Sequence, residues 1–215
     1  MTQRARFGAE KRITLAKELF DMQEVLCEGC GKSTPCYDIV SYGSAPGQRY
    51  RDLCSSCFNA EVAKHTGHDG FANIRFEPIG MVDRAGDQHE FHFQTRLLGN
   101  VVALDAFELR EGSPAGYRFQ VVGDPSDDAL VLLGRLIEKM RRALSTQHLV
   151  EGQYGLQIAE STVRGRIEWD DSAAERTPLV VVDGREISWD DFGRMLMAFE
   201  GWQFKLDISD PSEEV

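Results

Sequence analysis

The sequence lacks any long hydrophobic run. In its 215 residues, no apolar run approaches the roughly 18 uninterrupted apolar residues of a membrane-spanning helix. The opening residues 1–7 are not followed by the apolar segment of a secretory signal. Apolar residues make up 42% of the chain and charged residues 27%, which is enough for a sizeable core. We therefore expect a folded protein of the cytoplasm, with no membrane association.

Cysteine is missing from most of the chain. There are five cysteines, and all of them fall between Cys27 and Cys57. An odd number of thiols without a secretion signal does not suit a disulfide framework. Clustered thiols in a reducing compartment are more typical of metal binding.

The sequence also lacks an excess of basic residues. Lys and Arg number 24 against 35 Asp and Glu, which gives a formal net charge of −11. Residues 1–64 are nearly neutral, with 9 basic and 8 acidic residues, so the acidic excess lies in residues 65–215. An acidic body repels phosphate backbones, which disfavours nucleic acid as the main partner. Only the first part, with Arg4, Arg6, Arg49 and Arg51, leaves nucleic-acid binding open.

Familiar catalytic motifs are absent. The chain contains no Gly-x-x-x-x-Gly-Lys-[Ser/Thr] phosphate loop and no Gly-x-Ser-x-Gly nucleophile motif. The segment from His89 to His92 is one residue shorter than the His-Glu-x-x-His zinc motif, and on a strand these two histidines would point to opposite faces. An enzyme would have to assemble its site from distant residues such as Asp105, His92 and arginines. The sequence favours a protein that is not an enzyme.

Two Cys-x-x-Cys pairs carry the most specific signal. Cys27 and Cys30 form the first pair, and Cys54 and Cys57 form the second. Between them the pattern predicts a hairpin of residues 37–42 and 49–53, and a helix begins at the second pair. Four thiolates complete a tetrahedral zinc shell and leave no position for water or substrate, so we expect a structural Zn²⁺ site. Iron–sulfur ligation is the main rival.

These motifs support a resemblance. The run Cys27-x-x-Cys30-Gly31-Lys32-Ser33, followed by Leu53-Cys54-x-x-Cys57, resembles the zinc-binding domain at the front of ClpX-type protein unfoldases. The resemblance covers residues 26–66 and implies a small treble-clef finger that dimerises and docks substrates and adaptors in the bacterial cytoplasm. It implies that the four cysteines are the ligands. The remainder resembles uncharacterised bacterial proteins, which adds no function.

The patterning predicts an α+β protein in four segments: an N-terminal helix within 1–25, the finger at 26–68, an antiparallel sheet plus helix at 69–150, and a strand–hairpin–helix–strand unit at 151–215. The first helix is expected over residues 9–22, because its apolar residues repeat at helical spacing. A period of two beginning at residues 74–76 predicts a meander of about four strands.

A second helix is expected after the meander to cover the sheet. Asp124 is its expected N-cap, and its buried row is expected to contain Leu130, Leu133, Ile137, Met140 and Leu144. In the last segment, Asp183 and Gly184 predict a tight hairpin turn. Ser188 and Asp191 predict a helix start, and residues 202–206 a final strand.

Several single residues have competing interpretations. Cys36 could be a substitute ligand or a reactive thiol, but a small buried side chain is favoured. His65 and His68 could bind metal, yet four cysteines already suffice. Asp105 could be catalytic, although an ion pair with Arg96 or Arg118 is favoured. We expect Lys139, Arg141 and Arg142 at a solvated helix end, and Trp169, Trp189 and Trp202 in the core rather than on a binding surface.

Taken together, these features predict a zinc-stabilised module that binds another protein, as an adaptor or scaffold. The basis is the closed four-thiolate shell and the lack of a catalytic motif. Nucleic-acid binding through the finger and an enzyme site in the acidic part are the alternatives. A homodimer is a further expectation, because the finger dimerises in the family it resembles.

Overall fold

The computed structural model describes residues 24–43, 49–68, 70–153, 155–170 and 177–213. These residues form three α-helices and five small antiparallel sheets, a mixed α and β architecture as the sequence predicts. The helix expected over residues 9–22 lies outside the described residues. Within the described part of the chain, no helix combines the length and the apolar character needed to cross a membrane.

The cysteine region consists of two hairpins and a helix. Strands β1 (Glu24–Leu26) and β2 (Ser33–Pro35) form the first hairpin. After the 3₁₀ turn η1 (Cys36–Asp38), strands β3 (Ile39–Tyr42) and β4 (Arg51–Cys54) form the second. Helix α2 (Ser55–Thr66) follows β4 directly. The expected second hairpin and helix are therefore present, and we call residues 24–68 the finger.

A four-stranded meander forms the centre of the molecule, as predicted. Its strands lie in chain order: β5 (Ile79–Val82), β6 (Gln88–Leu98), β7 (Val101–Arg110) and β8 (Ser113–Gly123). The prediction that the first strand begins near Ile74 was wrong. Pro78 directly precedes β5, and proline has no N–H group to donate to a ladder. Phe76 packs against the core from outside the sheet.

Helix α3 (Ala129–Leu144) covers one face of this sheet. Its N-cap is Asp128, whose side chain accepts a hydrogen bond from the Leu130 N–H, so the expectation of Asp124 was wrong. The residues buried against the sheet are Leu132, Leu136, Met140 and Leu144. Leu130, which was expected in this row, is 65% exposed. The helix carries two overlapping apolar rows, and packing against the sheet selects one of them.

The last part of the chain forms a separate small core. Its elements are the hairpin β9 (Leu149–Gly152) and β10 (Gly155–Ile158), the sheet β11 (Arg166–Trp169), β12 (Pro178–Val182) and β13 (Arg185–Ser188), the helix α4 (Trp189–Leu196) and the 3₁₀ turn η2 (Met197–Phe199). Asp183 and Gly184 have φ values of 49° and 68°, as the predicted tight turn requires. The side chain of Ser188 caps α4 as expected.

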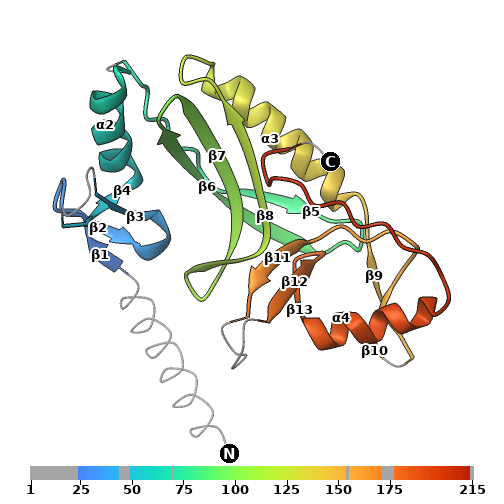
Figure 1. Cartoon of the computed structure of the whole chain (residues 1–215). Helices are drawn as coiled ribbons and strands as arrows, with labels where there is room; N and C mark the ends of the chain where they lie inside the picture. Colours follow the sequence, from blue (N-terminus) through green and yellow to red (C-terminus); the bar gives the residue numbers. More distant parts are fainter. Residues whose placement is uncertain (1–23, 44–48, 69, 154, 171–176, 214–215) are drawn as a thin grey trace, which may run out of the picture.

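The final strand expected at residues 202–206 does not form. These residues follow η2 without pairing to any strand among the described residues. Figure 1 shows this tail (red) leaving α4 and returning toward α3, while the finger (blue and teal) lies on the other side of the meander from α3.

Candidate metal centre and its surroundings

The turn between β1 and β2 positions the first cysteine pair. The N–H group of Gly31 donates to the carbonyl of Cys27 at 2.8 Å, and the φ of Gly31 is +71°, where glycine is favoured. Gly29 lies so close to the second pair that a Cβ atom there would come within 2.9 Å of the Cys57 Sγ. The two glycines therefore allow the turn to approach the other thiols.

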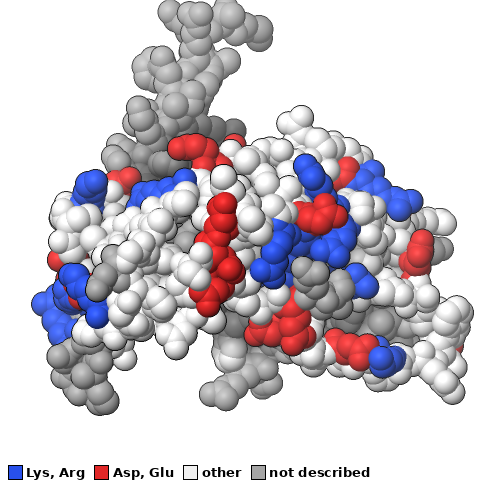
Figure 2. Space-filling view, turned by 90° about the horizontal axis from the view of Figure 1, so that it is seen from above, with Lys and Arg blue, Asp and Glu red and all other residues white. Residues whose placement is uncertain are grey.

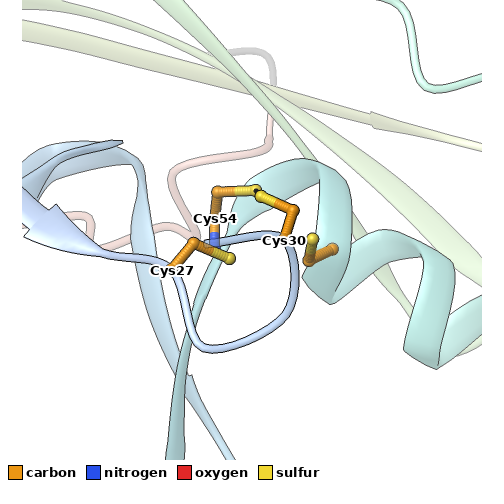
Figure 3. A group of neighbouring side chains, drawn as sticks. Cys27, Cys30 and Cys54 are labelled. Carbon is orange, nitrogen blue, oxygen red and sulfur yellow. Dashed lines mark hydrogen bonds between the residues drawn. The ribbon is translucent and has the colours of Figure 1, made fainter. Parts of the chain in front are cut away.

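The start of α2 positions the second pair. Cys54 ends β4 and is the N-cap of α2, and Cys57 lies in the first turn of this helix. The Sγ atoms of Cys27, Cys30, Cys54 and Cys57 all lie within 4.8 Å of one another, and those of Cys30 and Cys54 are 4.0 Å apart. Figure 3 shows the three labelled thiols pointing toward one another from the turn and from the helix start. No other cluster of this kind occurs within the part of the chain that the structure describes.

Backbone amides favour negative charge on one of these thiols. Burial acts to raise the pKa of Cys27, but N–H groups of Cys54, Cys30 and Gly29 outweigh it and lower that pKa to about 6. The Cys54 N–H lies 3.2 Å from the Cys27 Sγ. Burial and the neighbouring thiols raise the pKa of Cys57. A cation at the centre would favour the thiolate form of all four.

The donor set fits a soft metal ion. A tetrahedral zinc with Zn–S bonds of about 2.3 Å requires sulfur atoms about 3.8 Å apart, and these four thiols are close to that arrangement. Sulfur ligands select zinc or iron–sulfur clusters over hard cations such as Mg²⁺. Cys36 is exposed and lies outside the cluster, so the expectation that it is buried was wrong.

Asn59, a residue that sequence analysis missed, fixes the finger to the sheet. Its side chain is fully buried on α2. Its Nδ2 donates to the Thr95 carbonyl at 2.9 Å, and its Oδ1 accepts from the Leu97 N–H at 2.8 Å. Strand β5 pairs with β6 only as far as Phe91, so Asn59 satisfies backbone groups that no strand of the meander reaches on that side. The cluster of four thiols is thereby held close to the sheet.

The turn η1 forms a second contact between the finger and the sheet. The Tyr37 ring packs edge-on against Phe107 with centroids 5.6 Å apart, and the Tyr37 carbonyl accepts from Gln94 Nε2 at 3.1 Å. Arg75 bridges to Asp38 at 3.3 Å. The finger therefore has one face committed to the rest of the molecule.

Asp105 lies in a polar network on the same side of the sheet as Tyr37. Arg96 donates to its Oδ2 at 2.8 Å, and Gln120 Nε2 donates to its Oδ1 at 2.7 Å. Of the two expected partners, Arg96 is therefore the correct one, while Arg118 pairs with Glu168 at 3.2 Å. Both carboxylate oxygens of Asp105 have partners, which supports its structural interpretation.

A second cluster surrounds His89. Its Nδ1 lies 2.8 Å from Glu108 Oε1, its Nε2 lies 3.4 Å from Asp83 Oδ2, and the Tyr117 ring packs edge-on against the imidazole. The cluster lines a cavity of about 190 Å³ that also includes Arg110. His92 lies elsewhere, 3.1 Å from Glu90. His89 and His92 thus share no site. The partners of Asp105 are Arg96 and Gln120, whereas that of His92 is Glu90.

The remaining predicted residues lie away from the metal centre. Neither His65 nor His68 belongs to the thiol cluster, as expected. Lys139 is not simply solvated, because its Nζ donates to the carbonyls of Gln120, Pro211 and Glu213. The tryptophans expected in the core are on the surface: Trp169, Trp189 and Trp202 are 58%, 47% and 67% exposed.

Comparison with protein families gives three matches. Residues 26–69, 72–145 and 148–213 match three domains of unknown function, DUF7685, DUF7686 and DUF7713. The match over the finger is to the first of these and not to the unfoldase domain that the cysteine spacing resembles. Neither the curated proteins nor the solved structures gave a significant match.

Proposed function

We propose that this protein binds another protein through a zinc-stabilised finger of the treble-clef type. The observation that carries the proposal is the cluster of four thiols, because four sulfur ligands saturate a tetrahedral zinc and leave it no open position. A saturated zinc stabilises a surface and does not activate water. The hairpin β3–β4 followed by α2, with thiols from a turn and a helix start, supports the treble-clef assignment.

The free side of the finger offers a surface for the partner. Leu26 and Tyr50 are large apolar residues that are 67% and 70% exposed. They adjoin Glu28 and Arg49, whose side chains form an ion pair at 2.7 Å and so bring the two segments together. Exposed apolar groups rimmed by charges are typical of protein-binding sites. Tyr37 and Asn59, the residues of the finger that contact the sheet, are not part of this surface.

The charges of the finger do not favour nucleic acid. Arg49 pairs with Glu28, and Arg51 lies 3.7 Å from Glu61, so both arginines have acidic neighbours. In the view of Figure 2, the described Lys and Arg residues form separate groups with Asp and Glu beside them. A phosphate backbone requires a continuous basic track.

The test combines metal analysis with matched surface variants. We expect one zinc per chain in the wild type, Leu26→Glu and Tyr50→Glu, and loss of zinc in Cys57→Ser. A partner captured by the wild type should be lost with Leu26→Glu or Tyr50→Glu and retained with Val82→Glu, which replaces an exposed apolar residue of β5. A protein purified without metal, or a partner indifferent to both finger variants, would refute the proposal.

The His89 cluster supports a second candidate function, an enzyme acting on a small polar molecule. A carboxylate that holds one imidazole nitrogen can orient the other for proton transfer, and here Glu108 holds Nδ1. The buried Nε2 has no hydrogen-bond partner and lies 3.4 Å from Asp83 Oδ2, and both carboxylates line the cavity. A library of small metabolites should then contain a compound that raises the melting temperature of the wild type but not of Glu108→Gln. If both proteins are folded and no compound stabilises the wild type selectively, the proposal of an enzyme is wrong and the cavity is only a structural feature.

A further inference from the structure

The residues after η2 have the sequence of a strand and no strand to pair with. Trp202, Phe204, Leu206 and Ile208 alternate with polar residues over the segment 202–209, which we call the tail strand. Such a period of two is typical of a β-strand with one apolar face. In the structure, the four apolar side chains are 67%, 91%, 70% and 74% exposed.

The backbone of the tail strand is equally unsatisfied. Among the described residues, no backbone hydrogen bond involves residues 203–209. The segment is nevertheless fixed at both ends. The Trp202 N–H donates to the Phe199 carbonyl at 2.9 Å, and Lys139 Nζ holds the Pro211 carbonyl at 2.7 Å. An extended segment with free backbone groups and one apolar face is a template for pairing with another chain.

We propose that the partner of the tail strand is the tail strand of a second copy of this chain, paired antiparallel about a two-fold axis. The sequence is self-complementary in a single register. With Leu206 on the axis, Lys205 of each copy lies opposite Asp207 of the other, and Phe204 lies opposite Ile208. Opposite charges and apolar pairs directly across antiparallel strands stabilise them.

Neighbouring registers do not place opposite charges and apolar residues across from each other in this way. Centring the pair on Lys205 or on Asp207 places like charges opposite each other, which is destabilising. A shift of one residue places apolar residues opposite polar ones on both faces. In the single chain, Lys205 Nζ lies 3.1 Å from Asp207 Oδ2, so the two charges already lie on one side of the strand. The charge pattern thus selects a second copy over an unrelated sheet edge.

A two-stranded ribbon is marginal in water unless its apolar face is covered. The combined faces of two tail strands bring together two sets of the same four apolar residues. Met197 and Leu196, which precede the segment, are also exposed. An isologous contact of this kind closes on itself as a dimer and does not propagate.

The experiment is the oligomeric state of the full chain, measured by sedimentation over a wide range of protein concentrations. The wild type should form a dimer. Leu206→Lys, which sets two lysines against each other on the axis, should raise the dissociation constant by at least about tenfold. Because Leu206 is exposed in the single chain, this variant should keep the melting temperature that the wild type has at low concentration, where the wild type is monomeric. Leu26→Glu, on the finger, should leave the dimer intact.

The register is tested by charge reversal. Lys205→Asp alone and Asp207→Lys alone should each weaken the dimer, and the double variant should restore it. A wild type that stays monomeric at every concentration would overturn the proposal, as would a dimer unaffected by Leu206→Lys. A dimer lost with Leu26→Glu but not with Leu206→Lys would place the interface on the finger instead. None of these outcomes bears on the metal content, and only the last one bears on the partner of the finger.

Discussion

At the scale of single residues, one buried amide determines where the finger sits. The side chain of Asn59 forms hydrogen bonds with two backbone groups of β6 and with the Asn73 side chain, the last at 3.0 Å. Most buried polar groups in proteins are paired in this way, and removing one partner leaves the other unsatisfied. The packing of α2 on β6 therefore includes two polar contacts that only this side chain makes.

We predict that Asn59→Ala lowers the free energy of unfolding by at least about 2 kcal/mol, because each unsatisfied buried group costs roughly 1–3 kcal/mol. Urea unfolding in the presence of excess zinc is the measurement, so that metal loss does not contribute. Lys64→Ala on the same helix is the control, since Lys64 is exposed and its ion pair with Glu61 is long at 3.9 Å. Equal effects of the two variants would contradict the anchoring role.

Asp83 should contribute a pH-dependent part of the stability. Burial acts to raise its pKa, but the Asp87 N–H and the His89 imidazole outweigh burial and lower it. A group whose pKa is lower in the folded state stabilises the protein above the pKa of the unfolded state, about 3.9, and loses this contribution as the pH falls through the folded value. The stability difference between wild type and Asp83→Asn should therefore be largest at neutral pH and shrink on acidification.

Chemical unfolding of both proteins at pH 7 and at a series of lower pH values measures this difference. Acid also releases metal from thiolates, but it does so in both proteins and cancels in the comparison. A difference that stays constant down to strongly acidic pH would mean that the Asp83 carboxylate is not stabilised by its neighbours.

The sequence was informative about residues whose partners are local or whose spacing is specific. The four cysteines were predicted because two residues between each pair and a helix start are typical of metal ligands. Asn59 could not be predicted, because its partners Thr95 and Leu97 lie 36 and 38 positions away. The contact between His89 and Glu108 crosses 19 positions and depends on the register of the meander.

At the scale of elements, periodicity predicted the type of most elements but not the contacts of each. Helix α3 was predicted from its apolar spacing, and Met140 and Leu144 of the expected row are buried, but Leu132 and Leu136 take the places expected for Leu130 and Leu133. Its first turns carry apolar residues at 130, 131, 132 and 133, so the sequence offers two rows of similar quality. Which row is buried depends on packing against Phe91, Leu104 and Val121 of the sheet. The sequence of the helix alone does not contain this information.

A pair of leucines tests this assignment. Leu136→Ala should destabilise the protein by about 2–5 kcal/mol, because Leu136 is fully buried and its truncation leaves a cavity. Leu130→Ala, one of the positions expected to be buried from sequence, should change stability by less than about 0.5 kcal/mol. Thermal and urea unfolding measure both. The reverse order would mean that the helix packs through the row that the sequence suggested.

In the tail strand, periodicity predicts the apolar face but not the partner that covers it. A period of two at residues 202–206 predicted a strand, and the described chain supplies none to pair with it. A pattern specifies which face is apolar, but it cannot specify whether the covering surface comes from the same chain. The mismatch became an argument for intermolecular pairing only because the segment is also exposed and self-complementary.

At the scale of the whole molecule, the finger and the sheet are connected through shared residues. Leu97 of β6 belongs to the buried cluster of the finger, together with Leu53, Phe58 and Val62. The core with α3 lies on the same face of the sheet, because Leu97 is directly opposite Val102, which belongs to that core. The metal centre should therefore influence β6 without touching it, because α2 holds both the second thiol pair and Asn59.

Metal removal should accordingly loosen the part of β6 that β5 does not cover and leave β7 and β8 protected. Zinc sites of this kind contribute folding free energy to the unit that contains them, so chelation should unfold the finger. The Leu97 N–H then loses its acceptor on Asn59, and its hydrogen exchange should accelerate. Leu104 of β7 pairs with Val121 of β8 in the core with α3, and the amides there should stay protected from hydrogen exchange.

Hydrogen exchange with and without a strong chelator resolves this pattern by peptide. Asn59→Ala with zinc present provides the matched comparison, since it should accelerate exchange near Leu97 while the thiols still bind metal. If chelation instead leaves Leu97 protected, the finger keeps its contact with β6 without the ion. If it exposes β7 and β8 as well, the finger and the sheet unfold as a single cooperative unit, and the metal stabilises the molecule beyond its own segment.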